Sequence, residues 1–150
     1  MFDALIDRLT ARLYGPVELL FRVALSLIFL IGGLGHFMRA EDMLTRIVDS
    51  PWHDFVLALG SPLLFLHLSG AVFIIAGLLL IVGYSTRLAA LALFVTLVPI
   101  TFVIHIAPGH EGPLFKNVAI LGALLFIAVR GSYRLSIDGR LRAPGFTASI

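Results

Sequence analysis

Cysteine is absent from this chain of 150 residues, and charged residues make up only 13% of it. The absence of cysteine excludes disulfide exchange, thiolate nucleophiles, and metal or iron–sulfur sites held by sulfur. The scarcity of charge, together with 59% hydrophobic residues, departs from a soluble domain, in which about a quarter of the residues are charged. These shortages predict a membrane protein in which any redox role needs a carrier other than cysteine.

The chain also has no charge block, low-complexity segment or Ser- or Pro-rich linker that would divide it. We therefore expect one membrane domain over residues 1–150. The formal net charge is +2, but the basic residues lie at the edges of apolar segments and form no continuous stripe. This distribution argues against nucleic acid as a partner and makes the lipid bilayer the expected one.

Four apolar segments approach the length of about 20 residues that a membrane-spanning helix needs. They are residues 17–37, 63–83, 88–107 and 114–129. The last is short unless Lys116 extends outward to the interface. Small residues in every segment allow close helix packing, which predicts an all-α fold, an integral membrane four-helix bundle. Pro99 should kink the third span, with Thr96 available to bond a freed carbonyl.

Two further segments are amphipathic rather than apolar throughout. Residues 1–15 place Phe2, Leu5 and Ile6 at helical spacing, which predicts a short amphipathic interfacial helix that precedes the bundle. The loop over residues 38–62 contains two short amphipathic pieces, with Trp52 at the level of the interface. This loop is a candidate lid.

Apart from Arg22, the basic residues are divided unequally between the two ends of the predicted bundle. One end has Arg39, Arg46 and Lys116. The other end has seven arginines, Arg8, Arg12, Arg87, Arg130, Arg134, Arg140 and Arg142. By the positive-inside rule, both termini and the tail over residues 131–150 are expected in the cytoplasm, and the loop over residues 38–62 outside.

Glu18 and Arg22 are ionisable residues inside the first predicted span. They stand at positions i and i+4 with the acid nearer the amino end, which is the favourable order for a helical ion pair. This spacing predicts an intramembrane ion pair. Two interpretations remain open for it: a self-neutralised pair near the headgroups, or a functional site, since charge inside a membrane is costly.

All five histidines fall on the outer half of the predicted bundle. Alternating helix directions bring His36, His67 and His105 to a similar depth as Lys116 and Asn117. Such a group can bind a metal, ligate haem or hydrogen-bond a quinone carbonyl. The same side chains are equally typical of the membrane–water boundary, where they need no ligand.

Among these ligands we favour a quinone, because a lipid-soluble headgroup reaches an outer cavity directly from the bilayer. No H-x-x-x-H pair and no C-x-x-C-H haem attachment motif occurs in the chain, so haem or a metal is less favoured. The five residues of the histidine, lysine and asparagine group are therefore candidate quinone-binding residues. We assign no catalytic residue and no metal ligand.

Three stretches resemble the DoxX family of small four-span bacterial membrane proteins: "RVALSLIFLIGGLGHF", "AGLLLIVGYSTRLAAL" and "FKNVAILGALLFIA". The resemblance covers about Arg22 to Val129. The residues that match recurrent family positions are Arg22, Gly77, Gly83, Arg87, Lys116, Asn117 and Gly122. Family members often have a glutamate a few residues before the position of Gly77, where this chain reads "SGAVFIIAG". Any family activity that depends on that carboxylate is in doubt here.

The resemblance implies a protein of the bacterial inner membrane. Relatives are associated with quinone-linked oxidation of sulfur compounds, with resistance to quinones and electrophiles, and with membrane complexes that recruit redox enzymes. We therefore expect a quinone-associated redox accessory or docking subunit with a protein partner, rather than an independent enzyme. Two alternatives stay open: a structural or assembly subunit without a ligand, and an oligomeric transporter of a small solute or protons.

Overall fold

The computed structural model describes residues 2–106 and 109–143, and these residues form helices and no strands. The helices in chain order are α1 (Phe2–Met38), α2 (Ala40–Val48), α3 (His53–Leu59), α4 (Pro62–Val82), α5 (Thr86–Ile100), the π-helix η1 (Thr101–His105), α6 (Glu111–Arg130) and α7 (Ile137–Leu141). Four helical segments of the described chain are long and apolar enough to cross a membrane. The predicted all-α membrane bundle is confirmed.

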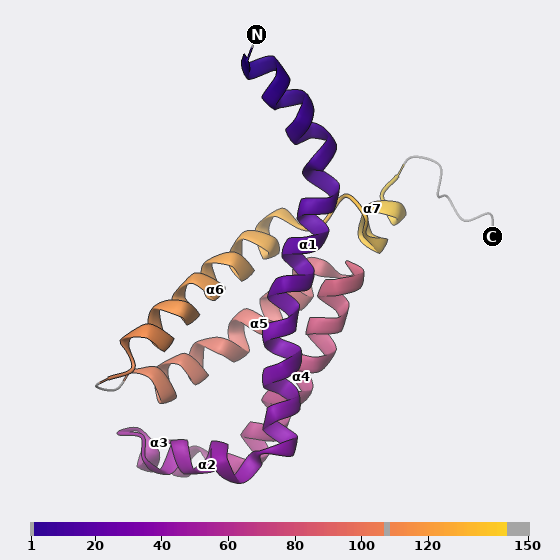
Figure 1. Cartoon of the computed structure of the whole chain (residues 1–150). Coiled ribbons are helices and arrows are strands. Elements are labelled where there is room, and N and C mark those ends of the chain that lie inside the picture. The colour runs from indigo at the N-terminus through magenta and orange to yellow at the C-terminus, as the bar shows by residue number, and fades with distance from the viewer. Residues whose placement is uncertain (1, 107–108, 144–150) are drawn as a thin grey trace, which may run out of the picture.

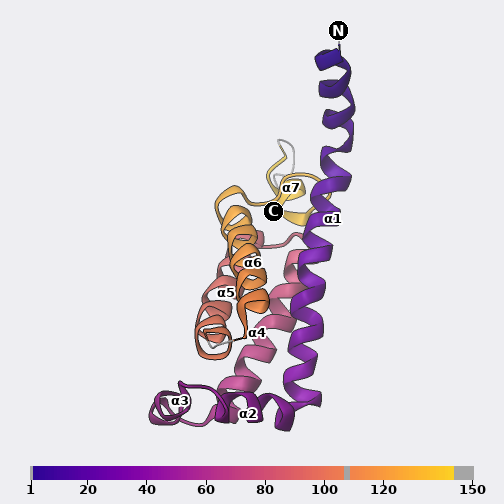
Figure 2. The same ribbon diagram turned by 60° about the vertical axis from the view of Figure 1, so that its left-hand side comes forward.

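The four spanning segments pack as two pairs that lie side by side (Figures 1 and 2). Helix α1 packs mainly against α4, and α5 packs mainly against α6, while α4 and α5 join the two pairs. Helices α2 and α3 lie across one end of the bundle, here called the loop end. Helix α7 lies at the opposite end, where α6 ends, and this is called the terminal end.

The bundle interior is built from apolar side chains with small residues at the closest helix crossings. Phe29 and Phe73 meet edge to face with ring centroids 5.0 Å apart. A Cβ at Gly33 would lie 2.8 Å from the Gly70 carbonyl oxygen, and one at Gly70 would lie 3.1 Å from the Gly33 oxygen. These two glycines therefore permit the close approach of α1 and α4. Gly122 has no such role, because a Cβ there would meet nothing within 4 Å.

The first part of the chain differs from its prediction as a separate interfacial helix. Helix α1 continues without a break from Phe2 through Pro16 to Met38. Pro16 removes one backbone donor but does not end the helix. A tertiary contact supports this turn, because an Arg134 amino group donates to the carbonyl of Ala11 at 3.1 Å. The spacing of apolar residues in residues 1–15 does not reveal this contact, because Arg134 lies near the other end of the chain.

The third span also differs from its prediction in detail. The Thr96 hydroxyl donates to the Ala92 carbonyl at 2.8 Å, whereas Pro99 lacks the N–H that would bond Val95. Instead, the backbone widens after Pro99 into η1, and the Thr101 hydroxyl donates to the carbonyl of Leu97 at 2.7 Å. Single π-helical turns of this kind are frequent at functional sites.

The remaining boundaries lie close to the sequence prediction. Helix α4 begins at Pro62, after the Ser61 hydroxyl accepts from the amide of Leu64, and it ends before Gly83 in the left-handed conformation. Helix α6 begins at Glu111, three residues before the predicted start of the fourth span. The helix of this span therefore includes Lys116, whose side chain is exposed. The two amphipathic pieces predicted between residues 38 and 62 form α2 and α3.

Candidate ligand cavity

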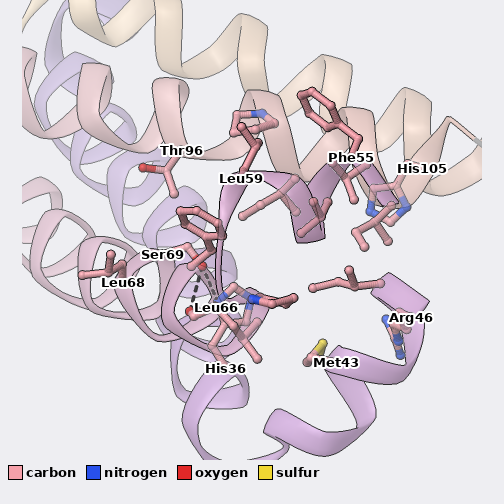
Figure 3. Close-up of a pocket in the computed structure, with 18 of the residues that line it drawn as sticks. His36, Met43, Arg46, Phe55, Leu59, Leu66, Leu68, Ser69, Thr96 and His105 are labelled. Carbon is pink, nitrogen blue, oxygen red and sulfur yellow. Dashed lines mark hydrogen bonds between the residues drawn. The ribbon is translucent and has the colours of Figure 1, made fainter. Parts of the chain in front are cut away.

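A cavity of about 580 Å³ lies at the loop end, between α4, α5, η1 and the α2–α3 segment (Figure 3). Its volume falls within the range of about 300–1,000 Å³ that is usual for small-molecule sites. Apolar side chains form most of its wall, and a few polar side chains interrupt them. The polar lining residues are His36, Arg46, Ser69, Thr96 and His105.

His36 is buried at the end of α1, and its protonation can be assigned from its neighbours. Its Nδ1 lies 3.2 Å from the Leu66 carbonyl oxygen and 2.9 Å from Ser69 Oγ. The Ser69 hydroxyl itself donates to the Leu66 carbonyl at 2.8 Å. A carbonyl oxygen can only accept, so Nδ1 carries the proton. In the neutral ring, Nε2 is then an acceptor.

His105 ends η1 and lies on the other side of the cavity from His36 (Figure 3). Its Nδ1 is buried and has no hydrogen-bond partner among the described residues. A buried polar atom without a partner is uncommon and often marks a place where water or a ligand binds. The cavity therefore presents two imidazole rings to a shared apolar volume.

The sequence-predicted group of five residues does not assemble as a whole. His36 and His105 line the cavity, but His67, Lys116 and Asn117 do not. The His67 ring stacks on Phe37 with centroids 5.1 Å apart, and Lys116 is exposed. Asn117 is buried and donates through Nδ2 to the Thr101 hydroxyl at 3.0 Å. It therefore ties α6 to η1.

Several lining residues lie outside the sequence prediction. The α2–α3 segment supplies Met43, Arg46, Ile47, Phe55, Val56 and Leu59. Their amphipathic spacing indicated a buried face, but nothing in the pattern showed which surface that face would cover. Ser69 was not selected as a ligand residue, although it is the one hydroxyl side chain within the second span. The segment covers the cavity, as expected of a lid.

The lid is attached to the π-helix by polar and aromatic contacts. The Ser50 hydroxyl donates to the Val103 carbonyl at 2.5 Å and accepts from the Trp52 amide at 3.1 Å. The rings of Trp52 and Phe102 lie 4.3 Å apart between centroids. Because η1 also carries His105, the lid and one imidazole of the cavity share the same support.

The cavity also reaches the outer surface of the bundle beside α4. Phe65 and Leu68 both line the cavity, and they remain 42% and 54% exposed. On α5, Thr96 and Pro99 also line the cavity. The surface of the spanning helices faces acyl chains, so an opening here faces lipid.

Glu18 and Arg22 do not form the predicted direct ion pair; among the side chains that the structure describes, which leave out those of residues 1–5, 8, 9, 107, 108 and 144–150, the only salt-bridge contact joins His53 and Asp54. Arg22 is 1% exposed and donates instead to the carbonyls of Leu80, Ile81 and Leu135 at 3.0, 3.1 and 2.7 Å. The last carbonyls of a helix lack intrahelical donors, so Arg22 satisfies the end of α4.

Glu18 binds the segment that follows α6. One of its carboxylate oxygens accepts from the Ser132 hydroxyl at 2.5 Å and from the Tyr133 amide at 3.2 Å. The sequence spacing is correct for an ion pair on one helix. It contains no information about backbone donors and acceptors that arrive from distant segments, and these donors and acceptors determine both contacts.

Asp138, on α7, completes the terminal end by capping α5. Its carboxylate accepts from the amides of Ser85 at 2.9 Å and Thr86 at 2.8 Å. Partial burial alone would raise the pKa of Asp138, but hydrogen bonds from Thr86 and Ser85 and the charge of Arg142 outweigh it and lower the pKa. Between this end and the cavity lies a layer of buried apolar side chains that includes Phe29, Phe73, Leu80, Leu93 and Leu124.

Four helices that are long and apolar enough to cross a membrane, with a cavity at one end, define a small multi-pass helical membrane protein. The DoxX family model matches residues 17–106, and the chain belongs to this family. It is similar to the Inner membrane protein YphA of Escherichia coli (strain K12), with 32% identity over 136 residues that cover 83% of this chain and 91% of the relative. No solved structure matches. The chain is thus a multi-pass protein of the bacterial inner membrane.

Proposed function

We propose that the cavity at the loop end binds the headgroup of a lipid-soluble quinone and that the chain acts as an accessory or docking subunit of a membrane oxidoreductase. One observation carries the proposal: two imidazoles face a mainly apolar volume that opens toward lipid beside α4. An apolar ring fits the walls, and an isoprenoid tail can leave through the opening between α4 and α5.

The assigned tautomer of His36 indicates which form of the ligand this wall suits. With the Nδ1 proton bound to Leu66 and Ser69, neutral His36 offers only an acceptor at Nε2. A hydroquinone hydroxyl can donate to that acceptor. An oxidised quinone has only carbonyl acceptors, so it needs the protonated ring as a donor. His36 therefore supports binding that depends on whether the quinone is oxidised or reduced.

The accessory role is supported by what the described residues lack. They contain no group of three His, Asp or Glu side chains placed to hold a metal ion, and the sequence carries no nucleotide-binding or nucleophile motif. In this proposal the chain supplies the quinone site, and a protein partner in a membrane complex supplies the electron-transfer chemistry. A homo-oligomer is the other assembly that remains open.

The test is extraction and chromatography of quinone from the full chain, purified from its native membrane in mild detergent. We expect nearly one quinone per chain, and His36→Ala and His105→Ala should each lower recovery about fivefold or more, the usual effect of one lost hydrogen bond. The matched controls are His67→Ala and Lys116→Ala, which lie outside the lining and should retain the wild-type amount.

Other results of this experiment would contradict the proposal. If folded protein contains no quinone, or if all four variants retain it equally, the scaffold alternative takes its place. The transport alternative has less support, because the apolar layer around Phe29, Phe73 and Leu124 separates the two polar ends. Solute or proton flux in proteoliposomes of the purified chain would reinstate it.

We also propose that both termini face the cytoplasm, which puts the cavity at the outer leaflet. This orientation rests on charge: the terminal end has eight arginines and four acidic residues, and the loop end has three basic and five acidic residues. A reporter enzyme that is active only outside the cytoplasm, fused after Ile150, should be inactive. Activity there would reverse the orientation.

A further inference from the structure

We propose that the terminal end holds the headgroup of an acidic phospholipid at a second site, independent of the quinone cavity. The site is the arginine cluster, defined here as Tyr14, Arg87, Arg130, Tyr133 and Arg134. Its residues come from α1, α5, the end of α6 and the segment after α6. The cluster joins segments that are more than 100 residues apart in the chain.

The ring of Tyr14 contacts two of the three arginines of the cluster. The Arg130 guanidinium carbon lies 4.6 Å from the centroid of the Tyr14 ring, and that of Arg134 lies 5.5 Å from the same centroid. Arg130 also lies 5.4 Å from the ring of Phe126. Contacts between cations and aromatic rings hold the guanidinium groups in defined positions. Two positive charges are thereby fixed close together.

Arg87 reaches the same place from α5. It donates to the Arg130 carbonyl at 3.2 Å and to the Tyr133 hydroxyl at 3.4 Å. The approach needs Gly131, which has φ +74°, because a Cβ there would lie 2.9 Å from Arg87 Nε. Since the Tyr133 oxygen accepts from Arg87, its own proton is free to be donated outward to an anion.

The acidic side chains at this end hydrogen-bond groups other than the three arginines of the cluster. No described carboxylate lies within salt-bridge distance of its three arginines. Glu18 accepts from Ser132 and from the Tyr133 amide, and Asp138 accepts from the amides of Ser85 and Thr86. Like charges held together repel one another unless an anion binds between them. The cluster is therefore complementary to a ligand with net negative charge.

The depth of the cluster selects a phospholipid over a free anion. Arg130 is the last residue of α6, and Arg87 is the second residue of the third span, so both guanidinium groups lie where apolar helix gives way to headgroups. Phe126, one turn deeper, is 53% exposed on the helix surface that faces acyl chains. A phospholipid can place its phosphodiester against the arginine cluster and its acyl chains beside the ring of Phe126, so it contacts both the charged and the apolar surface.

The test is native mass spectrometry of the full chain in nonionic detergent, with added phosphatidylglycerol or phosphatidylcholine of the same acyl chains. We expect selective retention of phosphatidylglycerol, which the double variant Arg130→Gln with Arg134→Gln lowers by about fivefold for each arginine. The matched control is Arg39→Gln with Lys116→Gln at the loop end, two basic residues outside the cavity lining, which should retain wild-type binding. Glycerol 3-phosphate at equal concentration should not compete.

Tyr14→Leu separates fixed geometry from charge alone, since it removes the shared ring and retains every arginine. Its retention of phosphatidylglycerol should fall by about threefold, the effect of one exposed cation–π contact. Equal retention of the two lipids would overturn the proposal, and so would equal losses in the terminal-end and loop-end double variants. Competition by glycerol 3-phosphate would assign the cluster to a free anion instead. The wild-type melting temperature serves as the folding control for each variant.

Discussion

The polar side chains at the two ends of the bundle differ in what they face. At the terminal end, Arg22 donates to three backbone carbonyls, and Asp138 accepts from two backbone amides. At the loop end, His36 and His105 face an open volume, and the buried Nδ1 of His105 has no partner among the described residues. Glu18 Oε2, Arg22 Nε and Thr86 Oγ1 at the terminal end are also buried without a described partner, so the two ends differ in another respect: of these residues, only His105 lines a cavity.

This difference separates structural from binding roles better than the residue types do. Arg22 is the side chain that looks most like a functional group in the sequence, because charge inside a membrane is costly. Its surroundings leave no room for a ligand, since even a Cβ at Gly83 would lie 2.4 Å from its Nη1. His36 and His105, which are of a residue type common at a membrane boundary, line the cavity described above.

The largest expected effect is that of Arg22→Ala. The substitution leaves the carbonyls of Leu80, Ile81 and Leu135 without their donor. Bonds to a charged group contribute about 1.5–3 kcal/mol each. We expect a loss of at least about 3 kcal/mol and a melting temperature in detergent lower by about 10 °C or more. Arg22→Lys should recover only part of the loss, because one ammonium cannot reach all three acceptors. A melting temperature equal to that of the wild type would contradict the structural role of Arg22 at the terminal end.

The next effect in size is that of Gly83→Ala. Gly83 has φ +68°, and a Cβ there would also lie 2.4 Å from Ser136 Cβ, so strain and overlap together should cost about 2–4 kcal/mol. The matched control is Gly122→Ala, where a Cβ meets nothing within 4 Å. Thermal melting of the two variants in the same detergent measures the contrast. Equal stability of both variants would show that the terminal end is not closely packed.

Asp138 should make the terminal end sensitive to acid. Its pKa is lowered in the folded chain, so its contribution to stability is fully present above its unfolded value and is lost as pH falls through the folded one. We expect the melting temperature of the wild type to fall below about pH 4. Asp138→Asn should lower stability at pH 7 by about 1 kcal/mol, as loss of a helix cap does, and reduce the acid dependence. An unchanged pH profile in this variant would contradict the capping role.

The smallest expected effect is that of Ser50→Ala at the lid. The lost bond to the Val103 carbonyl contributes about 1 kcal/mol, and the four spans do not depend on it. Hydrogen exchange should become faster in α2 and α3, by up to about fivefold, and stay unchanged in α4. Faster exchange in all helices would mean that the lid supports the whole bundle.

Much of the fold could be predicted from the sequence, because hydropathy reports directly on the spans. Three features required the structure. Residues 2–15 continue into α1 because Arg134 contacts Ala11, η1 follows Pro99 as a widened turn, and Arg22 bonds distant carbonyls in place of Glu18. The first and the third depend on contacts between segments far apart in the chain, which local spacing does not encode, whereas η1 follows Pro99 locally and is contacted by Asn117 from α6.

The sequence predicts the depth at which the candidate site residues lie in the membrane, but not the direction in which their side chains point. Alternating spans place all the selected polar residues near one end, and topology alone is enough for that. The rotation of each helix about its axis decides which of them face a shared volume. His36 and His105 do so, whereas His67 stacks on Phe37 and Lys116 is exposed. The cavity-lining residues of α2 and α3 could not be predicted, because an amphipathic pattern indicates that one face of a helix is buried but not which surface covers it.

Photolabelling with an azidoquinone, followed by peptide mass spectrometry of the full chain, tests the central claim most directly. The account predicts label concentrated in the cavity segments of α2 to α4 and in α5 with η1, and competition by unlabelled quinone. His36→Ala should lower the labelling, while His67→Ala should not. Label spread evenly over the lipid-facing surfaces of all four spans, or concentrated at the terminal end, would contradict it.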